Sequence, residues 1–170
     1  MEMQLQLLNK EDIYKDLAHR GIWFEVTEHK AVYNMDDLVD VEQPYPEADA
    51  KNLFVRDDKK KNYYLITVRG GKRVDLKAFR KSQGTRPLSF ASKEELRAIM
   101  GLFPGAVTPL GMLNDTEARV HFYLDASFLL ESGLIGIHPN DNTATVWIKT
   151  LDLISLIREH GNDVQIIEFE

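Results

Sequence analysis

One stretch near the middle of the chain, residues 50–69, constrains the fold more than any other. Two runs of alternating side chains, 52–56 and 62–68, flank five charged residues at 57–61. This pattern predicts a β-hairpin with a tight, charged turn. The alternation predicts that one face of the second strand is core and that the other is exposed or half-covered. Lys51 lies where the first strand begins, so a rigid backbone would hold its ammonium group at a fixed point.

The length and composition indicate one soluble domain, spanning 1–170. A chain of 170 residues buries enough surface to fold without covalent cross-links. It contains no cysteine, which excludes disulfides, thiolate zinc sites and cysteine nucleophiles. No window approaches the ~20 apolar residues of a membrane helix, and the N-terminus lacks the pattern of a secretory signal. We therefore expect a cytoplasmic protein that makes no membrane contact.

The charge of the chain is unevenly distributed. The net charge is −6, but residues 51–86 contain 12 Lys or Arg and only 3 Asp or Glu. A basic block inside an acidic protein is typical of local contact with a polyanion. The alternative is that these side chains are only the solvated faces of a hairpin and a helix. Composition alone leaves both interpretations open.

Helix and strand patterns are interspersed along the rest of the chain. The predicted helices follow the caps Asn9, Ser92 and Thr150, or span 35–41 and 74–81. The predicted strands span 23–28, 87–91, 119–125, 134–138, 143–148 and 164–169, besides the two of the hairpin. Several strand pairs are hairpins, so the sheet must be at least partly antiparallel. The predicted class is α+β, or mixed α/β.

Common catalytic signatures do not occur in the sequence. It has no GxGxxG, Walker-type, GxSxG or HExxH motif. The histidines are dispersed and none lies at helical metal-ligand spacing from another, so we expect neither a metal nor a cofactor. An enzyme of this kind would catalyse a reaction that needs little help, such as hydrolysis of an activated ester. The five histidines are His19, His29, His121, His138 and His160.

Three segments combine polar groups with unusual backbone chemistry. The first is Lys51-Asn52, and the second is the loop 105–111, where two glycines and a proline can present backbone N–H groups to a ligand. The third is the polar hairpin turn 138–145. Each has a simpler interpretation as a solvated strand end, a tight connection or an ordinary turn.

In this order, the segments resemble the YbaK-like aminoacyl-tRNA editing domains, a family also found inserted in bacterial prolyl-tRNA synthetases. The match is carried by Lys51-Asn52-Leu-Phe-Val-Arg-Asp with the following Lys-Lys-Lys-Asn62-Tyr-Tyr-Leu, by Gly105-Ala-Val-Thr-Pro109-Leu-Gly, and by His138-Pro-Asn-Asp-Asn-Thr143. The resemblance spans roughly residues 8–168. Within the family the chain is most similar to free-standing deacylases that hydrolyse alanine mischarged on proline tRNA.

The resemblance implies a mixed, partly barrel-like sheet flanked by helices, with the editing pocket between the sheet and the GxxxP loop. It implies that Lys51 is the essential lysine and that His138 lies near the substrate. Less securely, His29, Val32 and Tyr33 contribute to the walls of the amino-acid pocket. The substrate-binding residues predicted in this way are Asn52, Gly105, Ala106, Val107, Thr108, Pro109, Gly111, His138, Asn140, Asn142 and Thr143.

The function implied by the resemblance is hydrolysis in trans of mischarged tRNA(Pro), foremost Ala-tRNA(Pro), in translational quality control. The partners would be the tRNA acceptor end and, as further candidates, prolyl-tRNA synthetase or an elongation factor; we expect a monomer, with a dimer as the alternative. Three other interpretations remain open: a Cys-tRNA(Pro) deacylase, a non-catalytic tRNA- or synthetase-binding module, and a generic small-molecule binder. The basic residues predicted to contact the acceptor stem are Lys59, Lys60, Lys61, Arg69, Lys72 and Arg73.

Overall fold

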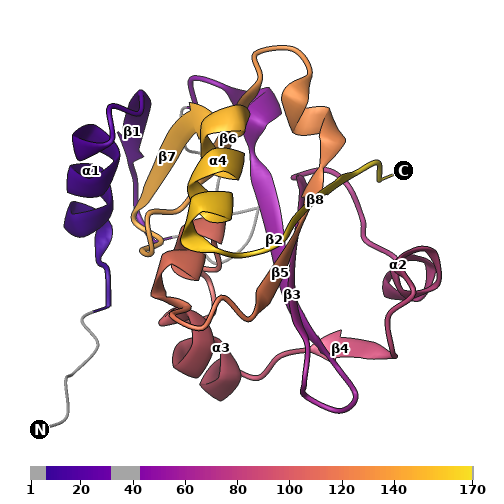
Figure 1. Cartoon of the computed structure of the whole chain (residues 1–170). Helices are drawn as coiled ribbons and strands as arrows, with labels where there is room; N and C mark the ends of the chain where they lie inside the picture. Colours follow the sequence, from indigo (N-terminus) through magenta and orange to yellow (C-terminus); the bar gives the residue numbers. More distant parts are fainter. Residues whose placement is uncertain (1–6, 32–42, 170) are drawn as a thin grey trace, which may run out of the picture.

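The computed structural model describes residues 7–31 and 43–169, and its strands form two sheets (Figure 1). One sheet has five strands in the order β4-β2-β3-β5-β8, and the other has three in the order β1-β7-β6. The strands are β1 (Phe24–Glu28), β2 (Ala50–Asp57), β3 (Tyr63–Arg69), β4 (Leu88–Phe90), β5 (Val120–Asp125), β6 (Leu134–Ile137), β7 (Ala144–Lys149) and β8 (Val164–Ile167).

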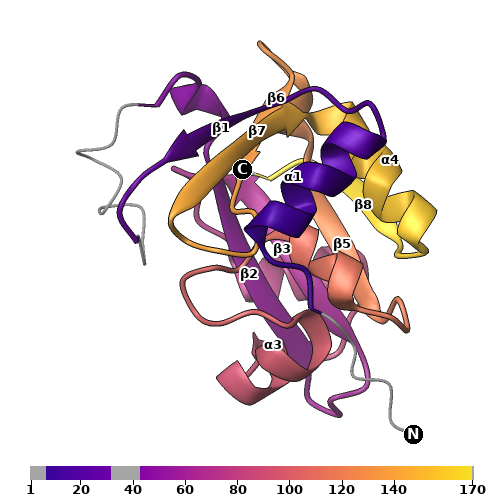
Figure 2. The same ribbon diagram turned by 90° about the vertical axis from the view of Figure 1, so that its left-hand side faces the viewer.

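Helices lie on both sides of the larger sheet. In Figure 1, α1, α3 and α4 lie on one side of it and α2 lies on the other, and Figure 2 looks onto the side with α1, α3 and α4. The α-helices are α1 (Lys10–His19), α2 (Leu76–Gln83), α3 (Lys93–Met100) and α4 (Thr150–His160), and the 3-10 helices are η2 (Pro46–Ala48), η3 (Pro109–Asn114) and η4 (Ala126–Leu129). The larger sheet is mixed, since β3, β5 and β8 pair in parallel while β2 pairs antiparallel with β3 and β4. The predicted α+β class with mixed, helix-flanked sheet is confirmed.

The predicted hairpin of β2 and β3 is present, and a buried carboxylate shapes its turn. Asp57 accepts hydrogen bonds from the N–H groups of Lys59 and Lys61, at 3.1 and 3.0 Å, and from the Asn62 amide at 2.8 Å. Burial alone would raise the pKa of Asp57, but these hydrogen bonds more than offset it and lower the pKa. The carboxylate therefore stays ionised and satisfies backbone donors that the turn would otherwise leave unpaired.

The prediction for the second face of β3 was wrong, because both faces of this strand are buried. Leu65 contributes to the main core, beneath the helices α1, α3 and α4. Tyr64, Ile66 and Val68 form a smaller cluster with Phe79 of α2 on the opposite face. A central strand that pairs on both edges and is covered on both faces fixes the position of its neighbour β2, and with it Lys51.

The helix caps are confirmed at two of the three predicted positions. Asn9 and Ser92 each form a capping box, with Asp12 and Glu95 as the partners. Thr150 is instead the first residue of α4, and its buried hydroxyl donates to the Phe128 carbonyl at 3.0 Å. The predicted helix at 35–41 lies outside the described residues. Within the described part of the chain, no helix is long and apolar enough to cross a membrane.

Among the residues that the structure describes, one isolated parallel bridge joins the two sheets. It pairs Asp49, just before β2, with Gly136 of β6. Gly136 must lack a side chain, because a Cβ there would collide with Cζ3 of the buried Trp147 and lie 2.6 Å from its Cε3. The Trp147 indole in turn donates to the Thr27 hydroxyl at 2.9 Å, so it cannot shift freely. Gly136 and Trp147 are paired across β6 and β7, so this close packing fixes β6 within the small sheet.

Lys72, which was predicted to contact RNA, forms a part-buried ion pair within the protein. Its ammonium group lies 2.9 Å from Asp125 Oδ2 and donates to the Phe169 carbonyl at 3.0 Å. Asp125 is 1% exposed and also accepts hydrogen bonds from the N–H groups of Arg69 and Ser127. Burial would raise the pKa of Asp125, but Lys72 and the other donors more than offset it and lower the pKa. The ion pair ties the loop after β3 to β5 and the C-terminal segment.

We predict that Gly136→Ala destabilises the protein by about 1–3 kcal/mol, because the added methyl group overpacks the contact with Trp147. Chemical denaturation measures the change in unfolding free energy. Gly71→Ala is the matched control, since nothing lies within 4 Å of a Cβ at that position. Equal stability of the two variants would contradict the close packing of Gly136 against Trp147.

We predict that Lys72→Met lowers the unfolding free energy at pH 7 by about 3 kcal/mol, because it leaves a buried carboxylate without its counter-ion. The folded-state pKa of Asp125 is lowered from 3.8, so its stabilising contribution is present above that pH and is lost as the pH falls through the folded-state value. The difference from the wild type should therefore shrink in acid. The exposed lysine variant Lys77→Met should show no such loss, and unchanged stability of Lys72→Met would rule out the assigned role.

Candidate functional site

The bridge between the sheets relates the positions of Lys51 and His138 along the chain. From Asp49 and Gly136 the two chains run in parallel, and Lys51 and His138 each follow two residues later. The residues between, Ala50 and Ile137, both pack against the main core. Since side chains alternate across an extended chain, Lys51 and His138 point away from that core. The candidate site therefore lies on the outer side of the junction.

His138 is held in one orientation as a neutral imidazole. Its Nδ1 lies 2.9 Å from the Ala144 carbonyl, which can only accept, so Nδ1 carries the proton. Burial lowers the pKa of His138, and nearby His29 lowers it further, against the opposing effect of the Ala144 hydrogen bond and of Asp141. The ring is thus neutral at pH 7. Its Nε2 has an unshared electron pair with which to accept a proton from water or substrate.

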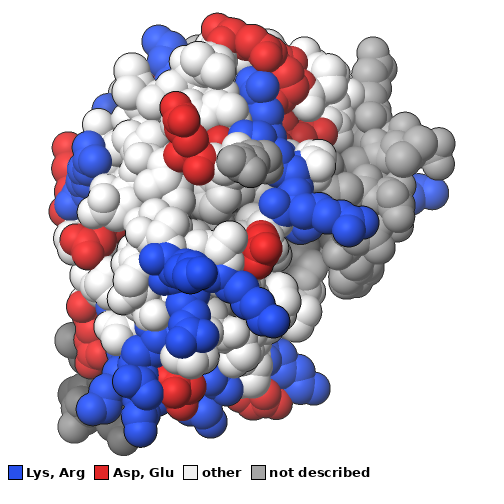
Figure 3. Space-filling view, turned by 90° about the vertical axis from the view of Figure 1, so that its right-hand side faces the viewer, with Lys and Arg blue, Asp and Glu red and all other residues white. Residues whose placement is uncertain are grey.

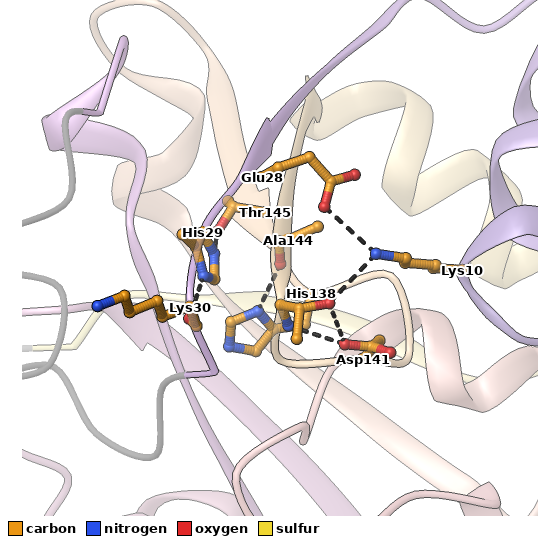
Figure 4. A network of polar contacts seen from close by, with 9 residues as sticks. Lys10, Glu28, His29, Lys30, His138, Asp141, Ala144 and Thr145 are labelled. Carbon is orange, nitrogen blue, oxygen red and sulfur yellow. Dashed lines mark hydrogen bonds and ion pairs between the residues drawn. The ribbon is translucent and has the colours of Figure 1, made fainter.

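His29 lies beside His138, as Figure 4 shows. The two ring centroids are 6.1 Å apart in an edge-to-face arrangement. His29 Nδ1 is 2.8 Å from the Lys30 carbonyl, and Nε2 is 2.9 Å from the Thr145 hydroxyl. Both nitrogens are therefore occupied, which suits a wall of the site better than a proton-transfer role. Val32 and Tyr33, also predicted as pocket walls, lie outside the described residues.

The polar turn after β6 is held by a charge network that the sequence did not indicate (Figure 4). Asp141 Oδ1 accepts from both the N–H and the hydroxyl of Thr143, at 2.8 and 2.5 Å. Lys10 lies 3.2 Å from that hydroxyl and 3.2 Å from Glu28. Burial would raise the pKa of Asp141, but the Thr143 hydrogen bonds more than offset it, so the pKa is lowered. Thr143 is therefore bound within the protein, and it positions the turn that carries His138.

Asn140 and Asn142, which were both predicted to bind substrate, lie largely inside the turn. Asn140 has a φ of +61° and donates to the Leu8 carbonyl at 3.0 Å, so it ties the turn to the segment before α1. Its Oδ1 is buried without a hydrogen-bond donor within the described structure. Asn142 is 4% exposed. Both side chains are thus placed to shape the turn from inside.

Some backbone N–H groups of the GxxxP loop are already hydrogen-bonded within the protein. Gly105 has a φ of +96°, which a residue with a side chain rarely adopts. The N–H groups of Ala106 and Gly111 donate to the carbonyls of Phe103 and Thr108, and Pro109 has none. Ala106, Thr108 and Pro109 are also buried.

Three backbone donors remain in this loop. In the described structure, the N–H groups of Gly105, Val107 and Thr108 have no hydrogen-bond acceptor. Gly105 and Val107 are partly exposed, so their N–H groups are the ones available to bind a developing negative charge, whereas Thr108 is fully buried. The predicted use of the Gly111 N–H for this purpose is not supported, because that group is already bonded within η3.

Lys51 and Asn52 face opposite sides of β2. Lys51 is half-buried, and its ammonium group has no ion-pair or hydrogen-bond partner in the described parts of the chain. Asn52 accepts from the buried Thr67 hydroxyl at 2.6 Å across the hairpin. Asn52 therefore supports the strand pairing behind Lys51, and the structure does not bring it to the same face.

The remaining basic residues gather on the face that carries α2 and the hairpin tip (Figure 3). The three lysines of the tip and Arg73 are exposed, as predicted, whereas Arg69 forms an ion pair with Glu131 at 3.1 Å. Three exposed residues of α2 extend this surface beyond the prediction. The residues of this basic face are Lys59, Lys60, Lys61, Arg73, Lys77, Arg80 and Lys81.

In the portion of the chain that the structure describes, no three acidic, histidine or cysteine side chains converge as a metal site would require. The chemistry that this site can offer is therefore a neutral imidazole, a free ammonium group and backbone N–H donors. Such a set suits the binding of phosphate or ester oxygens and the placement of a water molecule.

Known proteins are similar to this chain over nearly its whole length. The prolyl-tRNA editing protein ProX of Acetoanaerobium sticklandii is 33% identical over 159 residues, which are 94% of this chain and 96% of that protein. Prolyl-tRNA synthetase associated domain-containing protein 1 of Mus musculus is 31% identical over 165 residues, covering 95% and 96% of the two chains. A crystal structure described, provisionally, as a trans-editing enzyme for prolyl tRNA synthetase superposes with a TM-score of 0.68 over 97% of this chain and 100% of its own, at 24% identity.

A family model gives the assignment directly. The model for the aminoacyl-tRNA editing domain matches residues 29–156, which include Lys51, the GxxxP loop and the turn after His138. The match begins at His29, the second histidine of the site, and it ends within α4. The chain belongs to the aminoacyl-tRNA editing domain family.

Proposed function

We propose that this chain is a deacylase that acts in trans on mischarged tRNA(Pro), with Ala-tRNA(Pro) as the main substrate and 1–170 as one editing domain. The observation that carries the proposal is the parallel bridge between Asp49 and Gly136, which lies two residues before both Lys51 and the neutral imidazole of His138. The names of the two relatives, an editing protein and a synthetase-associated domain, support the choice of prolyl-tRNA. The protein would work in the cytoplasm, where tRNA is charged.

The reaction requires little from the protein, because an aminoacyl ester is already activated. Water adds to the ester carbonyl carbon, the bond to the terminal ribose oxygen breaks, and that oxygen leaves with a proton as a hydroxyl group. In the proposed mechanism His138 Nε2 accepts a hydrogen bond from the water and orients it. The neighbouring ribose hydroxyl assists in activating it. No strong protein base is needed.

The developing oxyanion would be stabilised by backbone donors and by Lys51. The free N–H groups of Gly105 and Val107 belong to a loop that Gly105 and Pro109 hold in a defined shape. Such preorganised donors stabilise charge in the transition state without reorganisation. Lys51 would bind a phosphate or ribose oxygen of the terminal adenosine, or the oxyanion itself. Its place on a strand paired with β3 fixes where that charge lies.

Selectivity for alanine would be steric. A pocket sized for a methyl group excludes the larger proline ring, so correctly charged tRNA survives. Rejection of a smaller side chain is weak, at about 1–3 kcal/mol per methylene, so glycine should be discriminated less sharply than proline.

We predict that Lys51→Ala slows single-turnover hydrolysis of Ala-tRNA(Pro) by about 100-fold or more, since one charged oxyanion or phosphate contact is removed. Quench-flow measurement with radiolabelled alanine gives the rate. Lys93→Ala, at an exposed position on α3, is the control and should behave as the wild type. A near wild-type rate for Lys51→Ala would rule out this lysine as the essential one.

The amino acid removed is tested by comparing alanyl, cysteinyl and seryl esters on the same tRNA(Pro). The proposal expects the highest kcat/KM for the alanyl ester. Preference for the cysteinyl ester would instead identify a Cys-tRNA(Pro) deacylase. Binding of tRNA(Pro) without hydrolysis of any ester would identify a non-catalytic module of the same fold.

The basic face would hold the acceptor stem through phosphate contacts. We predict that affinity for tRNA(Pro) falls steeply with salt, and that Lys77→Gln, Arg80→Gln and Lys81→Gln together reduce the slope of log K against log salt by about 2–3. Filter binding between about 50 and 200 mM salt measures it. Lys93→Gln with Lys149→Gln, two exposed lysines outside this face, should leave the slope unchanged. A salt-independent affinity would contradict this binding mode.

A further inference from the structure

Asp49 is a charged residue at the sheet junction, and its side chain has no role in the mechanism proposed above. It is half-buried, and its backbone is fixed by the bridge to Gly136 and by a hydrogen bond from the Gly70 N–H at 2.9 Å. With the Gln43 amide turned so that its nitrogen faces Asp49, that amide donates to Oδ1 at 2.7 Å and also to Oδ2. The carboxylate is thus held in one orientation.

No cation balances this carboxylate in the part of the chain that the structure describes. Lys51, two residues away, forms no ion pair with it. Burial raises the pKa of Asp49 to about 6, against the opposing effect of the Gln43 hydrogen bond, and the neighbouring Glu47 raises it further. At pH 7.5 the group is still ionised.

This ionised carboxylate destabilises the fold at neutral pH. Because the pKa in the folded state lies above the ordinary value of 3.8, folding favours the protonated form, and that stabilisation is lost as the pH rises through about 6. An oriented, uncompensated charge that lowers stability is typical of a functional site. It suits a ligand that brings its own positive charge.

The position of Asp49 fits one end of an aminoacyl ester. Asp49 and Lys51 are two residues apart on an extended chain, about 6.6 Å along the strand, and their side chains point to the same side. An aminoacyl-adenosine has an α-ammonium group at one end and, beyond the ester, ribose and phosphate oxygens. The spacing matches a molecule that presents its cation to Asp49 and its oxygens to Lys51.

We propose that the Asp49 carboxylate binds the α-ammonium group of the aminoacyl ester, and so restricts the site to esters with a free amino group. This inference rests on the proposed deacylase function. Substrates in which the amine is acylated, such as peptidyl-tRNA, lose the charge that Asp49 pairs with. The editing site would therefore spare nascent chains while it removes single mischarged amino acids.

The test compares alanyl-tRNA(Pro) with lactyl-tRNA(Pro), in which a hydroxyl replaces the amine at nearly the same size. Rates are divided by the uncatalysed hydrolysis rate of each ester. The wild type should prefer the alanyl ester by about tenfold or more in kcat/KM, the effect of one charge-assisted hydrogen bond. Asp49→Asn should lose most of that preference, mainly through a higher KM for the alanyl ester. Glu47→Gln removes a nearby carboxylate and should keep it.

Melting temperature at pH 7.5 separates this role from a structural one. Asp49→Asn should melt at the same temperature as the wild type or higher, because it removes an uncompensated charge while keeping the shape. The inference would be overturned if Asp49→Asn preferred the alanyl over the lactyl ester as strongly as the wild type does. It would also be overturned if Asp49→Asn lost activity on both esters equally and melted at a lower temperature. If the wild type hydrolyses neither ester, the proposed deacylase function itself fails.

Discussion

The parallel bridge between Asp49 and Gly136 is the contact on which the candidate site depends. It is one pair of residues long, yet it sets β6 of the small sheet beside the start of β2 in the large one. Within the small sheet, Trp147 of β7 packs so closely over its partner Gly136 that β6 and β7 have little freedom to separate. Lys51 and His138 are each two residues beyond the bridge, so its geometry determines their relative position. Without it, the lysine and the histidine would belong to unrelated sheets.

Lys72 and Lys51 differ in whether a carboxylate of the protein pairs with the ammonium group. Lys72 satisfies Asp125, a carboxylate with 1% exposure, and this pair serves the fold. Lys51 has no such partner among the described residues, although it is also half-buried. Its ammonium group is therefore available to bind an anionic group of a ligand. Asp49 presents the same situation with the opposite sign.

Local patterns were sufficient to predict much of the fold. The alternation of 52–56 and 62–68 gave the central hairpin, and the spacing of Ser92 and Glu95 gave a capping box that the structure contains. The opposite directions of Lys51 and Asn52 also follow from strand alternation, and were within reach of the sequence. By contrast, the role of Lys72 depends on Asp125, more than fifty residues later. No periodicity in the chain indicates that such distant residues meet.

The most direct test of the site is to map where a stable substrate analogue binds. In 3′-alanylamino-3′-deoxyadenosine an amide replaces the labile ester, and its binding can be followed by chemical shifts in an isotope-labelled protein. We predict that the largest chemical-shift changes occur at Lys51, His138 and the loop 105–108, with smaller changes at His29. Changes confined to the cleft between α1 and α4, lined by Leu8, Lys15, His19 and His160, would contradict it.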